Sequence, residues 1–276
     1  MNEQEQQRPP TLLCSDQDYG KSDNHVVGIV GHGSMGGAIE RSLAPHVSRF
    51  LCDPKYNISI DQLCEQEPLL TFVCTPCSNE DFSDTIDAVL KLIRHTKSGV
   101  VLKSTLPREK LFSLLTTIHT DNAMARFIYS PDLSSDNNTA HDFVNPDYMI
   151  VGGFVDSCNE LMQFYQFDTF MTLPTDATGV HICTHLEASI IFQSINAYLA
   201  MKTMFFTELA SIIDTQADLG VNYPLTARAI VADPRIGNTH WVGGGKIDTS
   251  AITDLLNGHE GSLPLLETII NSNQEA

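Results

Sequence analysis

The chain has 276 residues, of which 42% are hydrophobic and 18% are charged, and this length suits a globular protein of about two domains. Its 34 acidic and 16 basic residues give a formal net charge of −18, which repels nucleic acid and anionic membrane surfaces. The sequence has neither a signal-peptide core nor an apolar run of about 18 residues. We therefore expect a cytoplasmic protein with no nucleic-acid or membrane partner.

Residues 1–24 are polar, contain two adjacent prolines and are predicted to form a disordered arm. The seven cysteines are scattered, and Cys74 and Cys77 form a single C-x-x-C without the second pair that a zinc ribbon needs. His181 and His185 lie four residues apart on a predicted helix, without an evident third ligand. We interpret them as helix-surface residues and expect no metal site.

In residues 25–178, short apolar runs alternate with amphipathic segments. The apolar runs predict strands at 26–31, 49–53, 69–74, 99–104, 126–130 and 148–153. The segments between them predict helices at 35–44, 59–66, 80–95 and 107–118. This alternation is typical of an α/β domain with a doubly wound, mostly parallel sheet of the Rossmann-like kind, covered by helices on both faces.

The pattern of residues 179–276 is helical throughout. A helix predicted at 181–219 is too long and too apolar to lie alone on a surface, and shorter helices are predicted at 223–232, 249–257 and 263–271. We expect an all-helical domain built around the long helix. Its apolar faces predict packing in the core and pairing of two copies of the chain as a homodimer.

The strongest local motif follows the first predicted strand and opens the first predicted helix. It reads Gly31-His32-Gly33-Ser34-Met35-Gly36. In such a turn the first glycine permits the tight bend, the second lets a diphosphate approach the backbone, and the third lets the helix pack on the strand. The N–H groups of the helix N-terminus add donors and positive dipole. The motif therefore predicts a dinucleotide-binding site that needs no lysine.

The end of the second predicted strand carries a carboxylate, Asp53, about twenty residues after the turn. A carboxylate there accepts hydrogen bonds from the adenosine ribose and repels a 2′-phosphate, so NAD is favoured over NADP. Lys55 and Arg49 lie close enough in sequence to weaken this preference. The alternative interpretation is a glycine-rich turn that binds no ligand.

Further segments, in chain order, resemble the UDP-glucose/GDP-mannose dehydrogenase family over about residues 25–272. Residues 74–76 are similar to the V-P-T-P turn of that family, 103–107 to its K-S-T-V-P and 130–136 to its N-P-E-F-L-x-E. Residues 145–152 resemble N-P-D-R-x-x-I-G, 196–202 resemble N-A-F-L-A-x-K and 233–237 resemble D-x-R-I-G. Members of the family oxidise the C6 alcohol of a nucleotide sugar to a carboxylate with two NAD.

The resemblance implies roles for individual residues. Cofactor binding falls to Gly31, Gly33, Ser34, Met35, Gly36, Asp53, Thr75, Thr105 and Asp136. Among the implied catalytic residues, Thr105 helps to hold water, Asp132 works as the acid-base group and Asn196 stabilises the oxyanion, while Asp248 matches a further site aspartate. Substrate binding is implied for Asp132, Asn196 and Arg235.

Two departures from the family pattern divide the functional hypotheses. Phe192 stands where the family has a lysine, and Gly244 stands where it has the nucleophilic cysteine. The first hypothesis is a nucleotide-sugar dehydrogenase that is impaired or limited to one oxidation step, with Lys202 or Lys246 replacing the lysine. The second is a catalytically degenerate protein that binds NAD and dimerises in a regulatory or binding role. The third, a two-electron hydroxyacid dehydrogenase, is disfavoured by Phe192 as well.

Overall fold

The computed structural model describes residues 26–76, 82–133, 139–144, 146, 148–166, 179–237, 250–257 and 263–275. The chain divides into two compact units, Met1–Ser189 and Ile190–Ala276. Within the described ranges, no helix combines the length and hydrophobicity that a membrane crossing requires. The predicted arm at 1–24 lies outside the described residues.

The first unit contains a seven-stranded sheet in the order β2-β1-β3-β4-β5-β6-β7. Strands β1 to β5 run parallel, β6 is antiparallel to β5, and β7 is parallel to β6. This is the doubly wound, mostly parallel sheet that the sequence predicts. The strands are β1 (Val26–Val30), β2 (Ser48–Cys52), β3 (Leu70–Val73), β4 (Gly99–Leu102), β5 (Phe127–Tyr129), β6 (Met149–Gly152) and β7 (Val180–Cys183).

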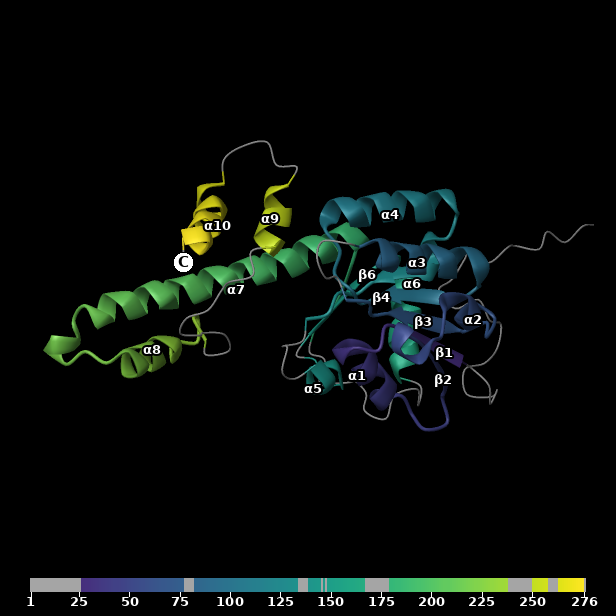
Figure 1. Ribbon diagram of the computed structural model, residues 1–276, viewed down its shortest axis with the longest axis horizontal. Coiled ribbons are helices and arrows are strands. Elements are labelled where there is room, and N and C mark those ends of the chain that lie inside the picture. Colours follow the sequence, from purple (N-terminus) through teal and green to yellow (C-terminus); the bar gives the residue numbers. More distant parts are fainter. Residues whose placement is uncertain are drawn as a thin grey trace, which may run out of the picture. The chain divides into compact units, whose positions relative to one another are not determined.

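Helices of the first unit lie on both sides of this sheet (Figure 1). Helix α1 packs against α5, whereas α3 contacts both α2 and α4. The helices are α1 (Ser34–Ser42), α2 (Ile60–Cys64), α3 (Ser83–His95), α4 (Arg108–Thr120), α5 (Thr139–Val144) and α6 (Val155–Gln166). Helices α5 and α6 were not predicted from the sequence. Helix α6 contacts β5 and β7, on either side of the antiparallel strand, whereas α5 packs on α1.

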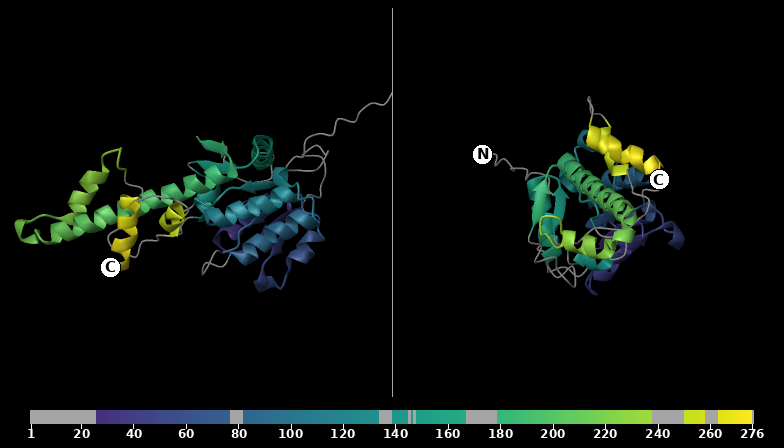
Figure 2. Two further views of the ribbon diagram at one scale, coloured as in Figure 1. Left: turned by 90° about the horizontal axis from the view of Figure 1, so that it is seen from above. Right: turned by 90° about the vertical axis from the view of Figure 1, so that its left-hand side faces the viewer.

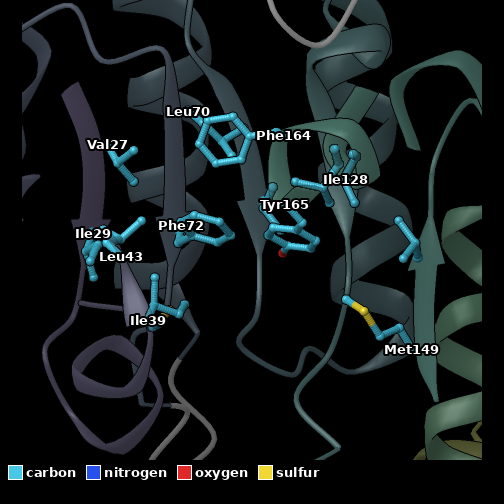
Figure 3. Packing of buried hydrophobic residues seen from close by; sticks show 14 of the residues in the cluster. Val27, Ile29, Ile39, Leu43, Leu70, Phe72, Ile128, Met149, Phe164 and Tyr165 are labelled. Carbon is cyan, nitrogen blue, oxygen red and sulfur yellow. The ribbon is translucent and has the colours of Figure 1, made fainter. Parts of the chain in front are cut away.

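The core on one face of the sheet joins the strands to α1 and α6 (Figure 3). Phe72 of β3 and Tyr165 of α6 stack with their ring centroids 6.3 Å apart and their planes at 7°. All residues of β3, β4 and β5 are buried, as expected for strands that helices cover on both faces. A rigid sheet therefore fixes where the loops at its carboxyl edge begin.

The second unit is helical in all of its described elements (Figure 2). Most of the long helix α7 (His185–Asp214) belongs to it, together with α8 (Tyr223–Val231), α9 (Ser250–Leu256) and α10 (Pro264–Glu275). Ala197 and Ala200 of α7 pack against Ile252 and Ile269. The small alanine side chains let α9 and α10 approach the long helix closely.

The structure corrects the predicted start of the long helix. Val180–Cys183 form β7, and α7 begins only at His185. Thr184 and Glu187 set this start, because the Glu187 carboxylate accepts the Thr184 N–H at 2.7 Å and the Thr184 hydroxyl accepts the Glu187 N–H at 3.2 Å. His185 is buried, with Nε2 3.0 Å from the Phe127 carbonyl oxygen. The interpretation of both histidines as residues of one helix surface is therefore wrong.

Candidate dinucleotide-binding site

In a doubly wound sheet, ligands bind outside the carboxyl ends of the strands at the point where the strand order reverses, and here that point lies between β1 and β3. The glycine-rich turn follows β1 and approaches the turn that follows β3. Gly31 has φ +84°, and a Cβ atom there would lie 2.7 Å from the Cys74 carbonyl oxygen. Only glycine therefore satisfies both the backbone conformation and the close approach of the two turns.

The other two glycines of the turn have opposite surroundings. A Cβ atom on Gly36 would lie 1.9 Å from the Gly31 carbonyl oxygen, whereas a Cβ atom on Gly33 would have no atom within 4 Å. Gly33 is also the N-cap of α1, whose first turn has no acidic residue and no side-chain cap. Free space, backbone N–H donors and the positive end of the helix dipole meet at this point. These residues fit the diphosphate of a dinucleotide.

Asp53 is held beside the glycine-rich turn by two backbone groups. Its carboxylate accepts the N–H of His32 at 2.6 Å and the N–H of Lys55 at 3.0 Å. Burial raises the pKa of Asp53, but these two N–H groups and the charge of Lys55 outweigh that effect and bring it below its ordinary value. A carboxylate has about four lone-pair positions, so acceptor capacity remains for the hydroxyls of a ribose.

A cluster of side chains surrounds His32 at the same place. The ammonium of Lys55 donates to the His32 carbonyl oxygen at 2.7 Å and to Nδ1 at 2.8 Å. The Tyr56 hydroxyl lies 3.1 Å from Nδ1, and the Glu40 carboxylate lies 2.7 Å from Nε2. Nδ1 is therefore the acceptor and Nε2 the donor. Glu40 and Tyr56 could not be predicted as parts of this cluster, because the glycine motif specifies backbone positions and not the side chains around them.

Arg49 has a different role from the one its sequence position suggested. Its guanidinium donates to the carbonyl oxygen of Glu40 at 3.0 Å and to that of Ala44 at 3.5 Å. These contacts tie β2 to the end of α1, where the last carbonyl groups of a helix need donors. Lys55 is therefore the cation next to Asp53.

Hydroxyl groups link the turns after β3 and β4. Thr75 Oγ1 lies 2.7 Å from Thr85 Oγ1 and 3.3 Å from Ser104 Oγ. The Ser104 hydroxyl donates to the Thr75 carbonyl oxygen at 2.7 Å. Because Thr105 directly follows Ser104, this network also places the predicted water-holding residue next to the turn that contains Thr75.

A cavity of about 170 Å³ lies farther along the same edge, between the ends of β4 and β5 and the start of β6. Its lining includes Met35 from the glycine-rich turn together with Lys103, Ser130 and Asp132. Lys103 donates from Nζ to Ser130 Oγ at 3.2 Å, and the Asp132 N–H donates to the Lys103 carbonyl oxygen at 3.2 Å. Burial lowers the pKa of Lys103, while the charge of Asp132 opposes this shift.

The remaining predicted site residues belong to the second unit or lie outside the described residues. Asn196 is half-buried on α7. Arg235 is exposed and pairs with Asp233 at 3.0 and 2.6 Å. Asp136, Asp248 and the motif position Gly244 fall outside the described ranges.

Lys202, one of the two lysines considered as a substitute for the missing family lysine, is buried in the second unit. Its ammonium donates to the carbonyl oxygens of Ile236 at 3.0 Å and Gly237 at 2.9 Å. These bonds fix the turn that follows α8, so Lys202 serves the fold at this position. Lys246, the other candidate, falls outside the described residues.

No model of a known protein family matches the chain. The UDP-glucose 6-dehydrogenase of Rhizobium meliloti is 26% identical over 183 residues, which are 63% of this chain and 41% of that protein. The UDP-glucose 6-dehydrogenase YwqF of Bacillus subtilis is 24% identical over 235 residues, which are 78% of this chain and 50% of that protein. The chain thus spans half or less of the length of these curated relatives.

Solved structures show the same fold at low sequence identity. A UDP-glucose dehydrogenase from Pyrobaculum islandicum matches with a TM-score of 0.64 and 17% identity, over 92% of this chain and 69% of that one. The 3-hydroxyisobutyrate dehydrogenase of Mycobacterium tuberculosis matches with a TM-score of 0.64 and 13% identity, over 91% of this chain and 93% of that one. The predicted resemblance to UDP-glucose/GDP-mannose dehydrogenases and the Rossmann-like fold with a helical C-terminal region are confirmed.

Proposed function

We propose that this chain is an NAD-dependent oxidoreductase of the nucleotide-sugar dehydrogenase kind that performs one oxidation of an alcohol. The observation that carries the proposal is the glycine-rich turn, where the open position beside Gly33 lies at the N-terminus of α1. Asp53 adds the carboxylate that would bind the ribose. Its lowered pKa keeps it ionised, and the His32 N–H holds it in place. When bound, NAD supplies the acceptor for a hydride. The curated relatives, which are UDP-glucose 6-dehydrogenases, support a nucleotide sugar as the substrate.

The contacts to the cofactor divide among its parts. Gly33, Ser34, Met35 and Gly36 would hold the diphosphate through backbone N–H groups, and Asp53 would bind the ribose. Gly31 would serve the cofactor site through the tight bend it permits, because its N–H donates to the Cys52 carbonyl oxygen at 2.9 Å. Thr75, Thr105 and Asp136 complete the cofactor set by resemblance. Since Asp53 repels a 2′-phosphate, NAD is the proposed form of the cofactor.

The substrate end of the site rests on acid-base chemistry. By resemblance, Thr105 holds a water molecule and Asp132 accepts a proton, while Asn196 stabilises the charged oxygen and Asp248 supports the site. Arg235 completes the substrate set together with Asp132 and Asn196. The side chain of Arg235 is already oriented by its bidentate contact with Asp233.

The missing cysteine limits the proposed chemistry to one step. A thiolate forms the covalent intermediate that makes a second oxidation possible, and Gly244 has no side chain to do so. The second candidate function, a regulatory or binding protein that retains NAD, is favoured by Phe192, since a phenyl ring cannot stabilise an oxyanion as an ammonium does.

A fluorescence titration with NADH tests whether the chain binds the cofactor, on which the proposal depends. We expect micromolar affinity, and no binding at millimolar NADH would remove both candidate functions. A single-turnover reaction with NAD⁺ and a panel of nucleotide sugars then separates them. One NADH per sugar supports the enzyme, none supports the binding protein, and two would contradict the single-step proposal.

Replacement of Asp53 by alanine is expected to weaken NADH binding about tenfold or more, because the two ribose hydroxyls lose an ionic acceptor. NADPH should lose less, or gain, since the repulsion of its 2′-phosphate disappears. Competitive titration with both cofactors measures the ratio. Lys55→Met is the matched variant, and it should lower NADPH affinity more than NADH affinity. If the ratio of NADH affinity to NADPH affinity is unchanged in both variants, the ribose binds to residues other than Asp53 and Lys55.

We also propose that the chain works in the cytoplasm as a homodimer that pairs through α7. Large apolar side chains are exposed on α7 at seven- to eight-residue intervals, which places Ile190, Tyr198, Phe205 and Ile212 along one stripe. A stripe of this kind in a protein of net charge −18 is typical of an interface.

Phe205→Glu is expected to turn the dimer into a monomer, because it places a charge at the centre of the stripe. Light scattering coupled to size-exclusion chromatography measures the mass. Phe112→Glu, which changes an equally exposed phenylalanine on α4, should leave the mass unchanged. A dimer that survives Phe205→Glu, or a wild-type monomer, would contradict the proposed interface.

A further inference from the structure

Lys103 is a buried lysine at the carboxyl edge of the sheet. Its side chain is 6% exposed, it directly follows β4, and it lines the cavity together with Asp132. Lysine is rarely found at such depth unless its charge is paired. A buried ammonium at this position therefore needs an interaction that offsets the cost of its burial.

The hydrogen bonds of Lys103 leave part of its capacity unused. An ammonium has three N–H donors. Within the described part of the chain, its hydrogen-bond acceptor is Ser130 Oγ, at 3.2 Å. Because buried donors without acceptors cost free energy, the two donors that have no acceptor among the described residues favour a polar group bound in the cavity.

We propose that Lys103 is the cation of the substrate end of the site, and that its ammonium binds the alcohol oxygen of the substrate in the cavity. This inference rests on the proposed function. The alcohol proton would move to the Asp132 carboxylate, and the hydride on the alcohol carbon would pass to bound NAD. The negative charge that develops on the oxygen as the proton leaves is stabilised by a buried cation. Lys103 thereby supplies the electrostatic role that Phe192 cannot.

The size and the lining of the cavity indicate which part of a ligand can bind in it. Its volume of about 170 Å³ is room for several water molecules, since one water needs about 10–15 Å³ of such space. The cavity therefore has room for the hydroxyl group of a ligand. Asp142 and Tyr148 line the cavity as well. Cys74, which directly follows β3, lies close enough to Lys103 to affect its pKa. The ligand is therefore expected to enter with its alcohol group first.

Thermal unfolding of Lys103→Met separates a binding role from a structural one. The substitution keeps most of the stem and removes a charge that the fold satisfies only in part, so the variant should melt at or above the wild-type temperature. Lys110→Met, on the exposed surface of α4, is the control and should melt as the wild type does. A lower melting temperature for Lys103→Met would make Lys103 a structural residue and overturn the inference.

NMR of lysine labelled with ¹³C at Cε reports the charge of Lys103 without any turnover, and Lys103→Met assigns its signal. In the free protein this signal should titrate at lower pH than an ordinary lysine, because burial disfavours the charged form. With NADH and UDP-glucose together, an unreactive pair, the Lys103 titration should move to higher pH, because the bound oxygen favours the ammonium.

Two results of this experiment count against the inference, and they are distinguishable. If fluorescence shows that NADH does not bind, the proposed function is removed and this inference falls with it. If NADH binds but the Lys103 signal stays in place with UDP-glucose present, the inference alone is wrong. A Lys110 signal that moves equally would also contradict a specific role for Lys103.

Discussion

Replacement of Gly33 by valine is expected to leave the fold intact and to lower NADH affinity by about 100-fold or more, which corresponds to about 2.7 kcal/mol. A Cβ atom at this position meets no protein atom within 4 Å, so the native packing tolerates the new side chain. The same space is where the proposed diphosphate approaches the N–H groups of α1. The added methyl groups would therefore collide with the cofactor and not with the protein.

Two measurements on each variant check this expectation, a melting temperature and an NADH titration. Gly33→Ala should give a smaller loss of affinity than Gly33→Val, because it fills less of the space. A valine variant that binds NADH as tightly as the wild type would show that the diphosphate does not bind at this turn. That result would remove the cofactor site on which the proposed function depends.

Replacement of Gly36 by alanine is expected to destabilise the protein by about 3 kcal/mol or more, within the range of severe core changes. Its Cβ atom would lie 1.9 Å from the carbonyl oxygen of Gly31. That contact is with backbone, so α1 has to move away from β1 and its packing on the sheet is lost. Urea denaturation of the apo protein measures the effect.

Gly37→Ala is the matched control for Gly36→Ala, since it adds the same methyl group at the next position of the same helix. The nearest atom to its Cβ would be the end of the flexible Arg41 side chain, at 3.1 Å. Alanine is also the better helix former by up to about 1 kcal/mol. We expect unchanged or higher stability, and equal losses in the two variants would contradict the packing argument.

The sequence predicted most of the elements that carry the dinucleotide site. Strands β1, β3 and β4 are largely apolar runs, and the glycine-rich turn is recognisable because each glycine has its own steric reason. Asp53 could be predicted because the length of one strand-helix-strand unit fixes where the second strand ends. These signals are local, so they need no knowledge of the tertiary structure.

What the sequence could not reveal depends on long-range packing. The reversed direction of β6 follows from its partner β5 and leaves no pattern in residues 149–152. Strand β7 was missed because its four residues precede a much stronger helical pattern. The burial of Lys103 could not be predicted either, since lysine is ordinarily a surface residue and only the fold encloses it beside Ser130.

The contact between the Asp53 carboxylate and the His32 N–H joins the recognition of the ribose to the shape of the phosphate loop. Exchange of this acid would thus also loosen the bend that receives the phosphates, so NADPH would gain less than the lost repulsion of its 2′-phosphate alone would give. The ammonium of Lys55 donates to the carbonyl oxygen of the same His32 at 2.7 Å, so both charged residues expected to set the coenzyme preference also hold this bend.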